Sequence, residues 1–98
     1  MSPEEEASSI RRSFSLYQNY PNPFNPTTEI KYALTKDCHV ELEIFNILGQ
    51  KVVTLADEKQ SAGYKSARWN SGKSASGVYF YKLTAGDFTE VKMMTLLR

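Results

Sequence analysis

Several features that often reveal a protein's class are missing from this 98-residue sequence. It has one cysteine, Cys38, which excludes an intrachain disulfide framework and any zinc site built from several cysteines. No apolar run approaches the roughly 18 residues of a membrane-spanning helix, and residues 1–13 lack the basic start and apolar centre of a signal peptide. The formal net charge is only +1, so no strong field attracts nucleic acid or anionic lipid. A small globular domain remains, with 41% hydrophobic residues to fill its core.

A helical period is also absent, and from residue 28 onward apolar residues recur at every second position. Short runs of this kind, separated by turn signals, predict strands at residues 28–34, 39–45, 51–55, 64–69, 78–83 and 88–97. Residues 56–63 and 70–77 are predicted to be polar connections. The inward side chains of the clearest runs are Ile30, Tyr32, Leu34, Val40, Leu42, Ile44 and Trp69. Short strands without helices predict an all-β fold, an immunoglobulin-like β-sandwich of about seven antiparallel strands.

The last two predicted strands form a hairpin whose register follows from its turn. A two-residue turn at Ala85-Gly86 pairs Phe80 with Val91 and Val78 with Met93. This register places four apolar side chains on one face, which we expect to be the core face. A slip of one residue would mix apolar with charged partners, so the pattern favours the first register.

The opposite face of this hairpin then carries Tyr79 beside Lys92 and Tyr81 beside Glu90. Together with Tyr64, these tyrosines are expected to be exposed. They are interpreted first as cross-strand packing partners whose hydroxyl groups reach water. The alternative is a platform for a carbohydrate or a peptide, because flat sugar faces and extended chains both stack on aromatic rings.

The chain before the first long strand divides into two parts. Residues 1–13 contain three consecutive glutamates and a single aliphatic residue, so we interpret them as a flexible linker or a non-native remnant. The domain is expected to span residues 14–98 and to begin with a Pro/Asn-rich lead, whose prolines exclude helix and central strand. The aromatic residues Tyr17, Tyr20 and Phe24 are expected to anchor this lead to the core surface.

No pattern in the sequence supports catalysis, and we expect no catalytic residue, cofactor or metal ion. Cys38 and His39 are neighbours on a strand, so their side chains point to opposite faces and cannot form a nucleophile pair. Glu41 and Glu43 share a face at about 7 Å, a spacing that can suit paired carboxylates, but a solvated face of alternating charge is the stronger interpretation. No phosphate-binding glycine loop, nucleophile elbow or HExxH pattern occurs.

Three long stretches of the chain resemble one known family. They are LYQNYPNPFNPTTEIKYAL at residues 16–34, VELEIFNILGQKVVTL at 40–55 and GVYFYKLTAGDFTEVKMMTLLR at 77–98. In this order and spacing they are similar to the C-terminal sorting domain of type IX secretion cargo proteins. The domain also resembles the immunoglobulin-like module of flagellar hook-capping proteins, which supports the sandwich but not a shared role.

The resemblance implies roles for particular residues. The family's motif positions fall on Pro21, Asn22, Pro23, Pro26, Gly49, Gly77 and Tyr79. The signal read by the translocon is expected in the final strand, which can offer backbone hydrogen bonds at a sheet edge. The candidate recognition residues there are Lys92, Leu96, Leu97 and Arg98. A cleavage point for a sortase is expected at the small residues Ala7, Ser8 and Ser9.

The resemblance implies a sorting module and not an enzyme. Such a domain follows a cargo domain, which is not part of this chain, docks it to outer-membrane secretion machinery and is usually removed by a cell-surface sortase. These are the expected partners, with no nucleic acid, small-molecule substrate or membrane insertion. The protein is expected to be secreted or on the surface of a Gram-negative cell, reached through the periplasm. The alternative is an accessory immunoglobulin-like binding module that attaches a secreted hydrolase to carbohydrate or to the cell surface.

Overall fold

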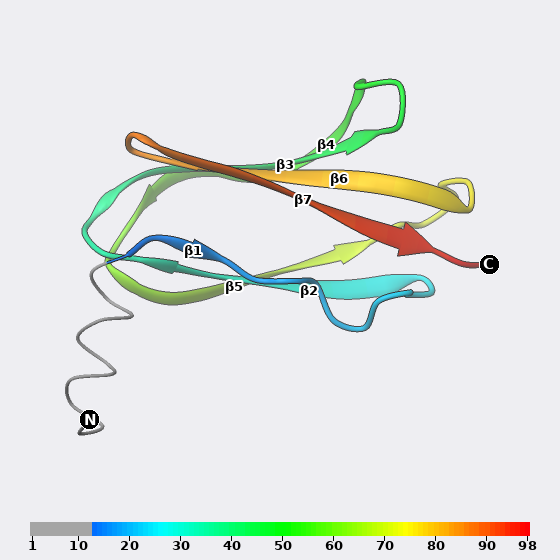
Figure 1. Cartoon of the computed structure of the whole chain (residues 1–98), viewed down its shortest axis with the longest axis horizontal. Helices are drawn as coiled ribbons and strands as arrows, with labels where there is room; N and C mark the ends of the chain where they lie inside the picture. The colour runs from blue at the N-terminus through cyan, green and yellow to red at the C-terminus, as the bar shows by residue number, and fades with distance from the viewer. Residues whose placement is uncertain (1–12) are drawn as a thin grey trace.

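The structure, a computed structural model, describes residues 13–98, which fold into two sheets packed face to face (Figure 1). The strands are β1 (Ser15–Leu16), β2 (Thr27–Leu34), β3 (Cys38–Asn46), β4 (Lys51–Gln60), β5 (Gly63–Asn70), β6 (Gly77–Ala85) and β7 (Phe88–Leu96). The part of the chain that the structure describes contains no helix suited by length and hydropathy to crossing a membrane.

The two sheets differ in size. The small sheet has the strand order β1-β2-β5, and the large sheet has the order β4-β3-β6-β7. Every pair of neighbouring strands is antiparallel. The predicted all-β, immunoglobulin-like sandwich of about seven antiparallel strands is therefore confirmed. The final strand, β7, lies at an edge of the large sheet, as expected for a strand that offers its backbone to a partner.

The core lies between the sheets and is built from alternate residues of each strand, because successive side chains of a strand point to opposite faces. All predicted inward positions of β2 and β3 are no more than 2% exposed, and Trp69 of β5 is 5% exposed. These buried residues are Ile30, Tyr32, Leu34, Val40, Leu42, Ile44 and Trp69. The period-two pattern thus identified the inner faces of β2, β3 and β5 correctly.

The predicted core face of β6 and β7 is wrong. Tyr79 and Tyr81 of β6 are buried, whereas Val91 and Met93 of β7 are 52% and 55% exposed on the outer face. The two strands gave conflicting signals, because Lys82 marks the outer face of β6, whereas Glu90 and Lys92 of β7 share a face with the buried Met94. The tyrosines lie inward because their hydroxyl groups find partners there: Tyr79 donates to the carbonyl of Ala75 at 2.7 Å.

The predicted register of this hairpin is also wrong, by two residues. Phe80 is opposite Met93 and Ala85 is opposite Phe88, so the two-residue turn is at Gly86-Asp87. Gly86 has a φ of +59°, which a glycine adopts without the steric cost that other residues pay. The shift by an even number of residues keeps the same side chains together on each face.

The polar segment after residue 55 is a strand and not a connection. β4 continues to Gln60, pairing Asp57 with Glu41 and Lys59 with His39. As an edge strand, β4 has one side facing solvent, so a charged sequence forms a ladder there without burying its charges. Irregularities in its pairing with β3 follow Leu42 and Ile44, which bend this ladder.

The lead before β2 is anchored by one of its three expected aromatic residues. Phe24 is 2% exposed and belongs to the core, whereas Tyr17 and Tyr20 are 37% and 80% exposed. The expectation is therefore correct for Phe24 and wrong for the side chains of Tyr17 and Tyr20. The prediction of a linker at residues 1–13 falls almost entirely outside the described residues.

Candidate functional site

One end of the sandwich gathers segments that are distant in the sequence. The turn between β3 and β4, the loop between β5 and β6, the lead before β2 and the C-terminus all lie at the right-hand end in Figure 1. The described chain enters β1 at the opposite end. Most residues to which the resemblance gave a role lie in or beside these segments, so this C-terminal end is the candidate site.

The lead closes the outer edge of β7 near its C-terminus. The Phe24 backbone N–H donates to the Thr95 carbonyl, and its carbonyl accepts from the Leu97 N–H, each at 3.0 Å. The Asn22 Oδ1 accepts from the Thr95 N–H at 3.0 Å, and Gln18 Nε2 donates to the Met93 carbonyl at 2.8 Å. This part of the edge is thus already hydrogen-bonded within the domain, so a partner cannot add a strand there without displacing the lead.

The terminal residue is held by the loop between β5 and β6. The Arg98 backbone N–H donates to Ser76 Oγ at 3.0 Å, and its Nε donates to the Ser74 carbonyl at 2.7 Å. Arg98 Nη2 lies 3.5 Å from Ser71 Oγ, which in turn donates to the Pro26 carbonyl at 2.8 Å. A single arginine therefore links the C-terminus, the loop and the lead.

An aromatic cluster lies beneath these segments. The ring centroids of Phe24 and Trp69 are 5.6 Å apart, and those of Trp69 and Tyr79 are 5.4 Å apart in an edge-on arrangement. These geometries fall in the range that aromatic pairs prefer. The cluster joins the lead, β5 and β6, so the motif position Tyr79 supports the end of the sandwich from inside the core.

The candidate recognition residues are divided by the fold. Leu96 is 0% exposed, whereas Leu97 is 55% exposed and Arg98 is also exposed. Lys92 lies about 20 Å from Arg98 along the strand, with its Nζ 3.5 Å from a carboxylate oxygen of Glu90. A partner that contacts the folded domain at this end can therefore reach Leu97 and Arg98, while Leu96 contributes by packing and Lys92 does not join them.

The remaining motif positions shape the backbone of the same end. Pro21, Asn22, Pro23 and Pro26 lie on the exposed lead. The carbonyls of Pro21 and Pro26 and the side chain of Asn22 accept hydrogen bonds there. Gly49 has a φ of +80° in the turn between β3 and β4, a conformation that strains other residues. Gly77 begins β6, next to the loop that contacts Arg98.

An apolar pocket that sequence reasoning missed opens at this end. It has a volume of about 360 Å³ between the β3–β4 turn and the start of β6. Its walls include Ile47 and Leu48, which are 68% and 76% exposed, together with Val78 and Tyr79. Adjacent exposed aliphatic residues form an apolar patch, which is more informative than a single one, so the Ile-Leu pair before Gly49 was the available signal in the sequence.

The outer face of the large sheet carries the expected charged residues. Cys38 is half-buried against the core and His39 is exposed, so the two side chains separate as predicted.

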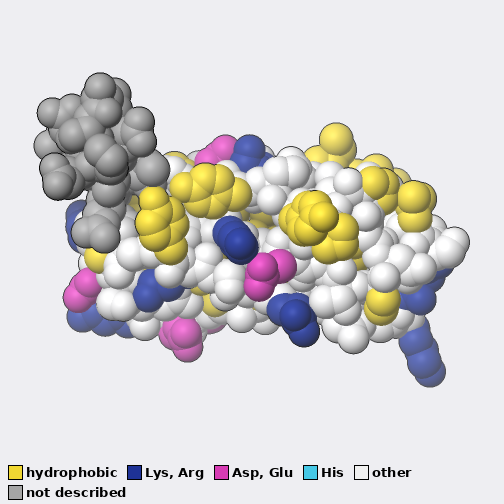
Figure 2. All heavy atoms as spheres, turned by 90° about the horizontal axis from the view of Figure 1, so that it is seen from below, with side chains coloured by type: hydrophobic (Ala, Val, Ile, Leu, Met, Phe, Trp, Pro, Cys, Tyr) yellow, Lys and Arg dark blue, Asp and Glu magenta, His cyan; other side chains and the backbone are white. Residues whose placement is uncertain are grey.

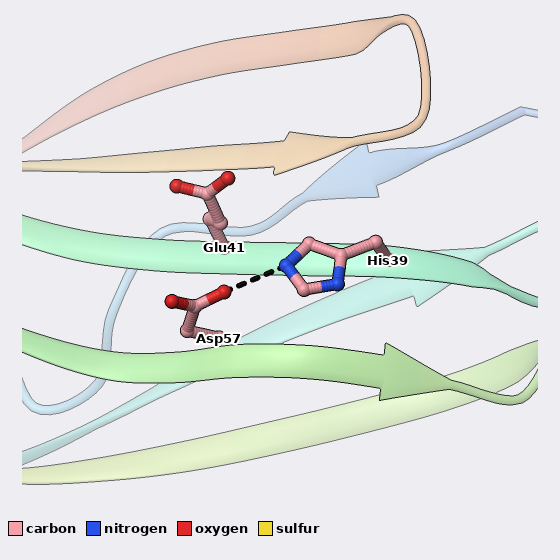
Figure 3. Close-up of side chains that lie close together, drawn as sticks. All are labelled: His39, Glu41 and Asp57. Atoms are coloured by element: carbon pink, nitrogen blue, oxygen red, sulfur yellow. Dashed lines mark hydrogen bonds and ion pairs between the residues drawn. The ribbon is translucent and has the colours of Figure 1, made fainter.

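Figure 3 shows His39 hydrogen-bonded to Asp57 of β4, with Glu41 nearby; the His39 Nε2 to Asp57 Oδ1 distance is 2.6 Å. Candidate metal-ligand atoms of these three residues lie within 4.8 Å of one another. Because His39 and Asp57 are exposed and bond directly, a solvated cross-strand pair accounts for them.

The buried Tyr81 holds the start of the lead. Its hydroxyl group donates to the Tyr17 carbonyl and accepts from the Asn19 N–H, both at 2.8 Å. Asn19 is itself 2% exposed and donates to Thr28 Oγ1 at 2.9 Å. Burial raises the pKa of Tyr81 to about 12, although the hydrogen bond from Asn19 opposes the rise. Tyr81 thus joins the large sheet to the lead through a satisfied polar network.

We expect Tyr81→Phe to lower the free energy of unfolding by about 1–3 kcal/mol, because the buried Asn19 N–H loses its acceptor. The variant also tests a pH dependence. Between pH 10 and about 12 the unfolded chain loses the Tyr81 proton while the folded chain keeps it, so stability falls as pH rises through this window. Urea unfolding at pH 9 and pH 11 measures both effects. A fall equally steep in Tyr81→Phe contradicts this assignment.

The comparisons with known proteins agree with this architecture. The family model described as "Secretion system C-terminal sorting domain" matches residues 18–96, which covers both the lead and the final strand. Neither the curated proteins nor the solved structures contain a match. This match includes nearly all of the described sandwich, and the chain therefore belongs to the family of type IX secretion C-terminal sorting domains.

Proposed function

We propose that this domain is a folded sorting signal that docks a cargo protein to the type IX outer-membrane machinery through the C-terminal end of the sandwich. The family is non-catalytic and its members direct proteins to the outside or the surface of the cell. The observation that supports the docking site is convergence: the lead, the Gly49 turn, the start of β6 and Arg98 lie at one end, opposite the entry to β1 (Figure 1). A cargo attached before β1 therefore leaves this end accessible.

The surface offered there combines exposed apolar and basic groups. Leu97 and Arg98 project beside the pocket-forming segments, and Ile47 and Leu48 are among the most exposed apolar residues of the described chain. Apolar contacts supply affinity and a fixed guanidinium supplies directional hydrogen bonds, a combination typical of protein interfaces. After export through the periplasm, a cell-surface sortase removes the domain at Ala7, Ser8 or Ser9, residues that lie outside those the structure describes.

The test is a fusion of the whole chain behind a periplasmic reporter in a type IX host. The double variant Leu97→Asp/Arg98→Glu is expected to keep the reporter in the periplasm, because it replaces an apolar and a basic contact with acidic ones. The matched control is Val91→Asp, on the same strand, about 20 Å away and similarly exposed at 52%. It is expected to leave export unchanged.

The reporter is measured in the periplasmic, surface and medium fractions, and its released form by mass spectrometry. Export of the double variant at the wild-type level contradicts docking at the C-terminal end. Equal loss in the Val91→Asp control places recognition elsewhere on β7. A released reporter whose last residue lies beyond residue 13 contradicts removal at the proposed linker.

A further inference from the structure

The six tyrosines of the chain separate into two groups. Tyr32, Tyr79 and Tyr81 are buried in the core. Tyr17, Tyr20 and Tyr64 are 37%, 80% and 60% exposed, and the described chain has no other exposed aromatic side chain. The earlier carbohydrate hypothesis named Tyr64, Tyr79 and Tyr81, and burial removes Tyr79 and Tyr81 from it.

The exposed tyrosines share the outer face of the small sheet. Tyr20 forms an antiparallel bridge with Glu29, and Tyr64 is opposite Ala33. The Tyr17 backbone N–H donates to the carbonyl of Lys31, so Tyr17 lies beside the residue between Glu29 and Ala33 that points to the same face. Because paired residues share a face, all three rings point away from the core. Figure 2 views this side of the molecule, where hydrophobic side chains stand apart with basic and acidic groups between them.

A polar hollow lies beside the most exposed ring. It has a volume of about 380 Å³ and is lined by Tyr20, Pro21, Thr27, Thr28, Glu29 and Arg68. Glu29 and Arg68 are directly opposite each other on β2 and β5. No ion pair or side-chain hydrogen bond joins them within residues 13–98, so the carboxylate and the guanidinium both keep their hydrogen-bonding capacity for a ligand.

We propose that this face binds a neutral, β-linked polysaccharide chain, with the hollow beside Tyr20 as its main subsite. A β-linked sugar ring has an apolar C–H face and a rim of hydroxyl groups. The face stacks on an exposed aromatic ring, while the hydroxyls donate to Glu29 and accept from Arg68. The hollow is more polar than most small-ligand sites, which suits a ligand rich in hydroxyl groups, and 380 Å³ lies within the size range of such sites.

A second contact lies further along the same face. A smaller hollow of about 340 Å³ is lined by Tyr64, Lys31, Lys65 and Ser66. The Ala33–Tyr64 row is four residues from the Glu29–Arg68 row, or about 13 Å along the strands. An extended chain can therefore touch both tyrosines, whereas one sugar ring cannot. Affinity is expected to rise with chain length for this reason.

The charges of the face favour a neutral ligand. In the main hollow the charge of Arg68 is balanced by Glu29 directly opposite it, so this subsite presents no field of one sign, whereas Lys31 and Lys65 line the second hollow. A sulfated or phosphorylated polymer would meet the Glu29 carboxylate in the main hollow, and this repulsion opposes binding. The main hollow adjoins the docking end, because Tyr20 and Pro21 belong to the lead. Its test measures sugar binding by the purified domain, so the result does not depend on export.

The test is calorimetric titration of the whole chain with cellohexaose, xylohexaose and laminarihexaose. A titration with cellobiose shows how affinity depends on the length of the sugar chain. Tyr20→Ala is expected to weaken the bound hexaose about tenfold or more through loss of stacking, whereas Tyr20→Phe keeps it. Tyr64→Ala is expected to weaken the hexaose but not cellobiose. The control is Met93→Ala, 55% exposed on the other sheet, with binding unchanged.

Circular dichroism and thermal unfolding check that each variant is folded. Retention of the fold is expected because the substituted side chains are exposed. The absence of binding to every hexaose overturns the proposal, and so does equal affinity of the wild type and Tyr20→Ala. Tighter binding to dextran sulfate than to the neutral hexaoses, lost at high salt, shows general electrostatic attraction and also overturns it. Binding of an unrelated extended peptide with the same Tyr20 dependence, but of no glycan, assigns the face to peptides and overturns it equally.

Discussion

Trp69→Ala is expected to lower the free energy of unfolding by about 3–5 kcal/mol, the range for a large buried aromatic residue. The indole is 5% exposed and contacts both Phe24 and Tyr79 at centroid distances of 5.6 and 5.4 Å. Its loss leaves a cavity and removes two aromatic pairs, each worth about 0.5–1.5 kcal/mol beyond area burial. For a domain of this size the midpoint of thermal unfolding should fall by roughly 12 °C or more.

Far-UV circular dichroism is the suitable measurement, because Trp69 is the only tryptophan and tryptophan fluorescence disappears with it. The matched control is Tyr64→Ala, on the same strand but 60% exposed on the opposite face. Its effect on stability is expected to stay within about 0.5 kcal/mol. An unchanged midpoint in Trp69→Ala, or equal losses in the two variants, shows that the inward face of β5 is assigned wrongly.

Leu96→Ala is expected to cost about 2–5 kcal/mol and to reduce export through loss of structure. Leu96 is 0% exposed and pairs with Gly77, and its neighbour Phe24 holds it through a parallel bridge. Truncation leaves a cavity where the lead, β6 and β7 meet, so the C-terminal end loosens. Urea unfolding gives the stability loss, and the reporter fusion gives the export at two temperatures. Export is expected to recover at the lower temperature, where a larger fraction of the domain is folded.

Leu97→Ala separates packing from recognition. Leu97 is 55% exposed, so its truncation is expected to change stability by no more than about 0.5 kcal/mol. Its effect on export should therefore persist at both temperatures, since it removes a contact and not a support. A large stability loss in Leu97→Ala together with none in Leu96→Ala reverses the assigned roles of the two neighbours.

Prediction of the core succeeded where one face of a strand was clearly polar. In β2 and β3, Glu29, Lys31, Glu41 and Glu43 alternate with aliphatic residues, so burying the charged face was energetically excluded. In β6 the contrast is weak, because Val78 and Phe80 on one face match Tyr79 and Tyr81 on the other, and the polar residues of the outer face come only at the end of the strand. Burying either face of the first half of β6 would then give a similar hydrophobic free energy.

The inward direction of the tyrosines depends on groups that are remote in the sequence. The hydroxyl of Tyr81 reaches the backbone of Tyr17 and Asn19, more than sixty residues earlier. A buried hydroxyl with two such partners costs little, whereas the same hydroxyl without them is destabilising. No local pattern around residue 81 contains this information.

The candidate site also has features that the sequence indicated and features that depend on the folded chain. Motif resemblance indicated the lead, Gly49, Gly77 and the final strand, and the structure brings these segments to one end. Two features depend on how β7 ends against the loop between β5 and β6. Leu96 is buried while Leu97 is exposed, and Arg98 donates hydrogen bonds to Ser74 and Ser76. The aromatic face with Tyr20 was missed, because a proline-rich segment does not reveal which of its rings a neighbouring strand covers.

Alternation of side chains along the sequence determined by itself that this chain forms short strands and that their aliphatic rows meet in a sandwich. The sorting-domain family was indicated by resemblance of its motifs, and the family model that matches residues 18–96 shows it. The tertiary structure alone decided which side of β6 is inside, where the hairpin turns, and which residues remain on the surface for partners. The physical reason is that strand period is a local property, whereas burial of a polar atom is decided by the partner that the folded chain brings to it.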